Sequence, residues 1–271
     1  MRHSQLFLRR AAAPLAIAGL ALAAACSRDS DSAGTAEAAT GRPSRRIPRD
    51  PYRVVSVEQG GRIDGVVALA ETPPPDTSVV PSGDVATSPS GMTGCGGPIR
   101  FPTVVSDGRH LGEAVVWLED VRAGKPLPVS RRFELTNEGC LLVPRVQAVI
   151  AGGMLNVKNA DPIPHRTRFT LEGDSIATVE HSDAGSVVPL ERVIAHPGLV
   201  EARSAFHPWM RSWIQVFDQP YFAVTARDGR FTLDSIPAGQ HHLVIWHPRY
   251  GTKDTTVTVG AGERASVVVG F

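Results

Sequence analysis

Short runs of apolar residues, separated by turn residues, repeat along most of this chain. The runs are rich in Val, Ile and Leu, and several alternate with polar residues, which is typical of strands with one buried face. The pattern predicts strands at 52–57, 62–69, 114–118, 131–136, 147–150, 154–157, 168–171, 186–193, 212–216, 222–226, 230–233, 242–246, 255–259 and 265–269. Asp228 and Gly229 lie between two alternating runs and predict a hairpin turn. No long stretch has the helical period, so we expect an all-β protein built of β-sandwiches.

The N-terminus has a different pattern, which is that of an export signal. Three arginines within the first ten residues precede an apolar stretch at 11–25. This stretch is shorter than the roughly 20 residues that a membrane-spanning helix needs. A charged start, a short apolar core and small residues before the break are typical of a signal peptide, which we place at residues 1–25.

Residues 22–26, with the sequence Leu-Ala-Ala-Ala-Cys, resemble the lipobox of bacterial lipoproteins. The resemblance implies that Cys26 is acylated and anchors the protein to a membrane. Ser27 stands where Asp favours retention at the inner membrane, so the implied location is the outer membrane, facing the periplasm. The alternative is ordinary cleavage after Ala25, because three alanines also form an A-x-A site.

Composition limits the remaining possibilities. Residues 26–52 are small, polar and basic, and predict a flexible tether behind the anchor. Residues 72–97 are dense in Pro, Ser, Thr and Gly and predict a long surface loop. The formal net charge of +1 gives no field that would recruit nucleic acid. We therefore expect no nucleic-acid partner.

Two cysteines remain if Cys26 carries lipid. An oxidising compartment favours a disulfide between Cys95 and Cys140. The alternatives are two free thiols or a shared metal, although the spacing is not that of a zinc pair.

The C-terminal part resembles a known domain. Residues 223–239 have the sequence A-V-T-A-R-D-G-R-F-T-L-D-S-I-P-A-G, similar to the carboxypeptidase regulatory-like (transthyretin-like) sandwich. The strands at 65–67 and 114–118 are similar to the opening strands of that family. The resemblance implies a discontinuous domain at 53–130 plus 219–271.

The stretch between these two parts, 131–218, resembles a cupredoxin. Residues 159–165, N-A-D-P-I-P-H, are similar to the segment that carries the first copper histidine, and residues 204–210, S-A-F-H-P-W-M, are similar to the C-x-x-H-x-x-M loop. The resemblance implies a Greek-key sandwich, inserted in or adjacent to the first sandwich, with copper as the cofactor.

The cupredoxin resemblance implies that His165, His207 and Met210 are the metal ligands. A blue-copper site also needs a thiolate, but the cysteine position is Ser204, and a neutral hydroxyl is a poor substitute. A cation at Arg166 would further disfavour a positive ion. Two interpretations stay open: a residual His/His/Met site suited to Cu(I), and a structural remnant whose imidazoles hydrogen-bond to the backbone.

The other histidines are expected to be structural. We place His241, His242 and His247 at strand ends or on the surface, and His181 and His196 in an irregular segment. The chain contains no nucleophile elbow, HExxH motif, P-loop or dinucleotide fingerprint, so we expect no enzyme.

The sequence therefore favours a non-catalytic, membrane-tethered binding or scaffold protein with a degenerate cupredoxin site, binding a protein or glycan partner. The alternative is a periplasmic protein that binds or handles copper, or an electron-transfer-like cupredoxin.

Overall fold

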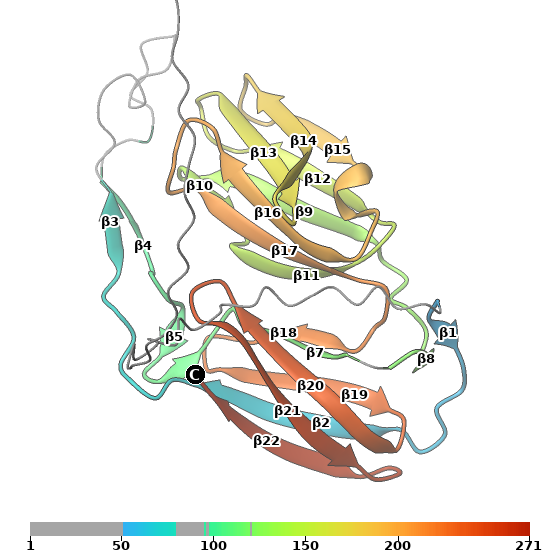
Figure 1. Cartoon of the computed structure of the whole chain (residues 1–271). Coiled ribbons are helices and arrows are strands. Elements are labelled where there is room, and N and C mark those ends of the chain that lie inside the picture. The colour runs from blue at the N-terminus through green and yellow to red at the C-terminus, as the bar shows by residue number, and fades with distance from the viewer. Residues whose placement is uncertain (1–50, 80–94, 96–97, 120) are drawn as a thin grey trace, which may run out of the picture. The chain divides into compact units, whose positions relative to one another are not determined.

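The computed structural model describes residues 51–79, 95, 98–119 and 121–271 (Figure 1). Chain contacts separate Met1–Ile47 from the compact unit Pro48–Phe271, which contains every described residue. The predicted signal peptide, Cys26, nearly all of the tether and most of the 72–97 loop lie outside the described residues. Within the described part, no helix is long and apolar enough to cross a membrane.

The protein is all-β and consists of β-sandwiches, which confirms the predicted fold class. Its described helical content is the short 3-10 helix η2 (Arg192–Ile194). Two small pairs stand apart from the main sheets: β1 (Arg53–Val54) with β8 (Ala123–Gly124), and β3 (Thr77–Val79) with β4 (Ile99–Phe101).

The first sandwich combines strands from both ends of the described chain. One sheet has the order β19-β2-β6-β5, with β22 also paired to β2, and the other has the order β18-β7-β20-β21. The bounds are β2 (Gly61–Ala68), β5 (Ser106–Asp107), β6 (His110–Leu111), β7 (Val115–Leu118), β18 (Phe222–Val224), β19 (Arg230–Ile236), β20 (Gly239–His247), β21 (Gly251–Val259) and β22 (Arg264–Gly270). Alternation fixes the buried face: Ile63 and Val67 of β2 lie in the core, whereas Arg62 is exposed.

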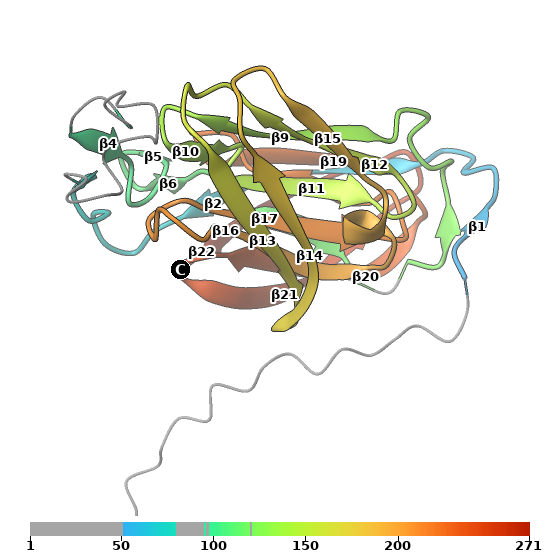
Figure 2. The ribbon, with the colours of Figure 1, turned by 90° about the horizontal axis from the view of Figure 1, so that it is seen from above.

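The second sandwich holds the strands between these two parts. Its sheets have the orders β10-β9-β12-β15 and β11-β17-β16-β13-β14. The bounds are β9 (Arg132–Glu138), β10 (Leu141–Val143), β11 (Val146–Ile150), β12 (Met154–Asn159), β13 (His165–Leu171), β14 (Asp174–His181), β15 (Val187–Leu190), β16 (Gly198–Ser204) and β17 (Arg211–Phe217). Figure 2 shows β9, β12 and β15 side by side, as their pairing requires.

Each sandwich has its own apolar core, and a small third cluster joins them. Val115 of β7, Val146 of β11 and Phe217 of β17 form that cluster. We propose that the two sandwiches are the domains expected at 53–130 plus 219–271 and at 131–218.

The Asp228–Gly229 turn forms, but the predicted hairpin is wrong. The Gly229 amide donates to the Ala226 carbonyl over 2.8 Å, and Gly229 has φ +72°. The flanking strands then enter different sheets, because β18 pairs with β7 and β19 pairs with β2. A local turn signal cannot specify which distant strand each arm will join.

His247 ends β20 inside the first core, where its side chain has no exposed surface. Its Nδ1 accepts a hydrogen bond from the Arg249 amide at 3.1 Å. Burial, together with the charges of Arg145 and Arg249, lowers the pKa of His247 from 6.5 to about 3. The folded protein therefore holds this imidazole neutral where the unfolded chain would protonate it.

Stability should consequently fall as the solution becomes acidic. Above pH 6.5 neither state binds the proton, but between pH 6.5 and about 3 only the unfolded state does. The free energy of unfolding should lose up to about 1.4 kcal/mol per pH unit in this window. Urea unfolding across this pH window measures the pH slope of the free energy of unfolding for wild type and His247→Gln. The exposed His196→Gln is the control. Equal slopes for wild type and His247→Gln would contradict the assignment.

Candidate metal centre

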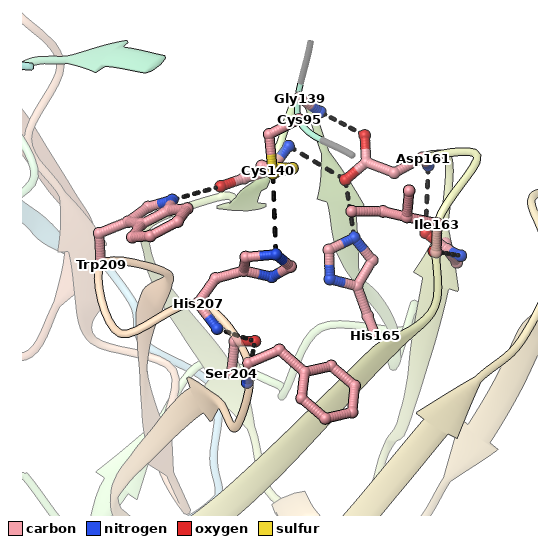
Figure 3. The surroundings of a disulfide bond; sticks show 11 residues. Cys95, Gly139, Cys140, Asp161, Ile163, His165, Ser204, His207 and Trp209 are labelled. Carbon is pink, nitrogen blue, oxygen red and sulfur yellow. Dashed lines mark hydrogen bonds and ion pairs between the residues drawn. A yellow bond between two sulfur atoms is a disulfide. The ribbon is translucent and has the colours of Figure 1, made fainter. Parts of the chain in front are cut away.

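The two predicted ligand histidines come from separate segments and meet inside the second sandwich. His165 is the first residue of β13, and His207 lies in the turn that follows β16. Both are buried, and their ring centroids are 5.1 Å apart with an interplanar angle of 59° (Figure 3). Strand pairing causes this meeting, because Thr167 of β13 lies opposite Ser204 of β16.

Ser204 holds the turn that carries His207. Its Oγ accepts hydrogen bonds from the amides of Phe206 at 3.2 Å and His207 at 3.1 Å. The turn closes when the Met210 amide donates to the His207 carbonyl at 2.9 Å. The hydroxyl therefore shapes the loop, but it supplies no thiolate.

Met210 is 1% exposed and belongs to the core cluster of this sandwich. Its carbonyl also ties the turn to the end of β16, since the Ser204 amide donates to the Met210 carbonyl at 3.2 Å. The thioether is therefore part of the apolar packing beneath the loop.

Asp161 fixes the orientation of the first histidine. The Nε2–H of His165 donates to Asp161 Oδ2 over 2.9 Å. Among the described residues, the buried Nδ1 of His165 has no hydrogen-bond partner. Metal-binding histidines usually have this arrangement, in which one nitrogen donates to a carboxylate and the other keeps its lone pair.

The Asp161 carboxylate also holds the turn between β9 and β10. Gly139 donates to Oδ1 over 2.7 Å and Cys140 donates to Oδ2 over 3.0 Å. Burial opposes ionisation of Asp161, but the hydrogen bonds from His165, Cys140 and Gly139 outweigh it and lower the pKa. The carboxylate therefore stays charged beside His165.

The Asn159 side chain holds the shape of the loop at 159–165 through hydrogen bonds to backbone groups. Its Nδ2 donates to the carbonyls of Ile163 at 3.0 Å and Asp183 at 3.1 Å, and its Oδ1 accepts from the Asp161 amide at 3.1 Å. The side chain thus braces the loop that presents Asp161 and His165.

The predicted disulfide is confirmed, and it lies directly against the site. Cys95 and Cys140 are bonded, with their Cα atoms 5.6 Å apart. The Nε2 of His207 is 3.7 Å from Cys95 Sγ (Figure 3). The Trp209 ring lies 5.2 Å from the His207 ring, and its indole N–H donates to the Cys140 carbonyl. The sequence alone did not place the disulfide here.

Two expectations about neighbouring residues are wrong. Arg166 does not point toward the ligand position: it is exposed, pairs with Glu180 at 2.8 Å and lies over the Phe206 ring. Consecutive strand residues face opposite sides, so burying His165 turns Arg166 outward. Its charge therefore does not argue against a metal.

His181 is not in an irregular segment, because it ends β14 directly opposite His165. Its Nδ1 is 2.7 Å from Ser186 Oγ, and its buried Nε2 has no hydrogen-bond partner within the described part of the chain. Burial and then the electrostatic interaction with the neighbouring His165 lower the pKa of His181. The polar composition of β14, half of whose residues are exposed, hid this strand from the hydrophobic pattern.

The remaining histidines lie elsewhere. His241 Nε2 contacts the Pro237 carbonyl, and His242 lies between Glu119 and Asp254. His196 is exposed just after η2. In the described residues, the clusters with three possible metal donors are Cys95, Cys140 and His207, and Cys140, Asp161 and His165.

No protein-family model and no curated protein matches the chain. Solved cupredoxin structures overlap with part of it. A purple cupredoxin from Nitrosopumilus maritimus is 18% identical over 31% of this chain and 99% of its own, with a TM-score of 0.27. A reduced amicyanin proline variant is 16% identical over 32% and 82%, with a TM-score of 0.28. The copper nitrite reductase of Thermus scotoductus is 18% identical over 38% and 25%, with a TM-score of 0.27. Overlap at these scores establishes no shared function.

Removing the Asp161 carboxylate should destabilise the protein. Asp161→Ala leaves the buried Cys140 and His165 donors, and the more exposed Gly139 amide, without their acceptor, so the free energy of unfolding should fall by about 2–4 kcal/mol. Urea unfolding at pH 7 measures the loss, with the exposed Asp183→Ala as control. The pKa of Asp161 is lowered from 3.8, so the difference should be complete above pH 3.8 and shrink below it. Equal losses in both variants would contradict this role.

Proposed function

We propose that this protein is a non-catalytic copper-binding protein of the cell envelope, which holds Cu(I) between His165 and His207. One observation carries the proposal. The His165 ring is fixed through Nε2 by Asp161, while its buried Nδ1 has no hydrogen-bond partner in the described chain and the His207 ring lies 5.1 Å away. A buried acceptor without a donor costs free energy, and a metal ion would remove that cost.

The separation of the rings fits one shared ion. A copper or zinc ion lies about 2.0 Å from an imidazole nitrogen, and so roughly 3.2 Å from the ring centroid. At angles near tetrahedral, two such centroids are about 5 Å apart. The observed 5.1 Å agrees with this spacing. Met210, buried in the same turn, is the third donor that we assign.

The donor set determines which copper chemistry the site supports. Two imidazoles and a thioether suit the soft Cu(I) ion, whereas blue copper needs a thiolate. The cysteine position is Ser204, and Cys95 and Cys140 are bonded to each other. We therefore assign binding or transfer of copper rather than electron transfer or catalysis.

A scaffold function is the second candidate, and the Ser204 turn favours it. The hydroxyl satisfies the Phe206 and His207 amides, so the loop keeps its shape without a metal. In that case the sandwiches would present a surface to a protein or glycan partner. In both cases we propose export by residues 1–25 and a lipid anchor on Cys26 that holds the protein at the outer membrane, facing the periplasm.

Copper binding distinguishes the two candidates. The Cys26→Ser chain should take Cu(I) from a chromophoric chelator with micromolar or tighter affinity, measured by the loss of chelator colour. His165→Ala and His207→Ala should abolish this competition. Asp161→Asn should weaken binding about 10–100-fold, because the carboxylate orients the ligand. The exposed His196→Ala is the matched control. Failure of wild type to compete better than His207→Ala would remove the copper function and leave the scaffold.

A further inference from the structure

The disulfide and the second histidine form a cluster that the proposed copper site does not use. The sulfurs of Cys95 and Cys140 and a ring nitrogen of His207 all lie within 4.8 Å of one another. The nitrogen facing the sulfur is Nε2, 3.7 Å from Cys95 Sγ. Copper held between the two histidines, as proposed above, would bind the other ring nitrogen of His207.

The spacing of these atoms suits a thiolate metal site. In tetrahedral zinc sites the metal lies about 2.3 Å from sulfur and 2.0 Å from nitrogen, so ligand sulfur and nitrogen atoms are about 3.5 Å apart. The observed Sγ to Nε2 separation of 3.7 Å is close to this value. While the sulfur–sulfur bond is present, the two cysteines cannot act as separate thiolate ligands.

A fourth donor is already present. Cys140 also belongs to a second cluster, in which its sulfur, Asp161 and His165 lie within 4.8 Å of one another. The two clusters share Cys140, so a metal beside this sulfur has either the Asp161 carboxylate or the His165 ring within reach. Two thiolates, one imidazole and one such donor make the four-coordinate set that Zn²⁺ prefers.

We propose that reduction of the Cys95–Cys140 disulfide converts this cluster into a binding site for a thiophilic divalent ion such as Zn²⁺. A dithiol reductant passes two electrons to the sulfur–sulfur bond and becomes a disulfide, leaving two Cys thiols. The metal then replaces the two thiol protons, which are released to water. Cys95, Cys140 and His207 are the ligands, with Asp161 or His165 as the fourth.

Hydrogen bonds hold the Cys140 half of the cluster without the covalent bond. The Cys140 amide donates to Asp161 and the Cys140 carbonyl accepts from Trp209, so hydrogen bonds hold this cysteine independently of the disulfide. Cys140 is buried, whereas Cys95 is only partly buried, so an incoming thiol reaches the bond from the Cys95 side. The site thus goes beyond the proposed copper function, since it forms in the reduced protein and uses the opposite side of the His207 ring.

Cadmium titration of the Cys26→Ser chain tests this proposal, because Cd²⁺ bound to thiolates gives an ultraviolet charge-transfer band. The oxidised chain should show no such band. After reduction by a phosphine, a single Cd²⁺ per chain should bind with the band, and Zn²⁺ should displace it. His207→Ala should lower the affinity at least about tenfold, and His196→Ala should not change it.

Further variants separate this site from the copper site. Met210→Leu should weaken Cu(I) binding by the oxidised chain and leave Cd²⁺ binding by the reduced chain unchanged. Circular dichroism of the reduced chain checks that it stays folded. Reduced chain that binds Cd²⁺ no more tightly than oxidised chain would overturn the proposal. The proposal would also be overturned if the reduced His207→Ala and His196→Ala variants bound Cd²⁺ with equal affinity, whether or not the reduced chain keeps its fold.

Discussion

The Asp161 carboxylate is the contact on which the rest of the site depends. It accepts hydrogen bonds from the Gly139 and Cys140 amides and from His165, and thereby ties the β9–β10 turn to the start of β13. The same turn carries one half of the disulfide that lies against His207. A single buried charge therefore sets the tautomer of one histidine and, through the turn, the position of the disulfide beside the other. These hydrogen bonds favour the charged form of Asp161 and thereby lower its pKa.

Ser204 separates the two properties that a cysteine would combine at this position. A thiolate would both hold the loop and tune the copper redox couple. The serine hydroxyl keeps only the first property, because it accepts from the loop amides but stays neutral. The loop geometry thus survives while the redox chemistry does not. This division is the reason that we propose copper binding rather than electron transfer.

Most of the longer strands could be predicted from sequence, because alternation is a local signal, although β14 and β16 were not expected. The meeting of His165 and His207 was expected from the cupredoxin resemblance. The expectation of an oxidising compartment was sufficient to predict the bond between Cys95 and Cys140. Its position against the site was not predictable, since Cys95 and His207 are 112 residues apart and meet only through tertiary packing. His181 was missed because half of the β14 residues are exposed and the strand lacks a clear apolar pattern. The outward direction of the Arg166 side chain follows from strand alternation, but only once β13 is known to begin at His165.

The central proposal is that His165, His207 and Met210 form a copper site that lacks only a thiolate ligand. The most direct test is to restore that thiolate by Ser204→Cys in the Cys26→Ser chain, with the Cys95–Cys140 disulfide intact, and to record the visible spectrum after adding Cu(II). If His165, His207 and Met210 converge as proposed, the loaded variant should become intensely coloured through thiolate-to-copper charge transfer, and the colour should disappear in Ser204→Cys with His207→Ala. A colourless Ser204→Cys protein that keeps its fold would contradict the account.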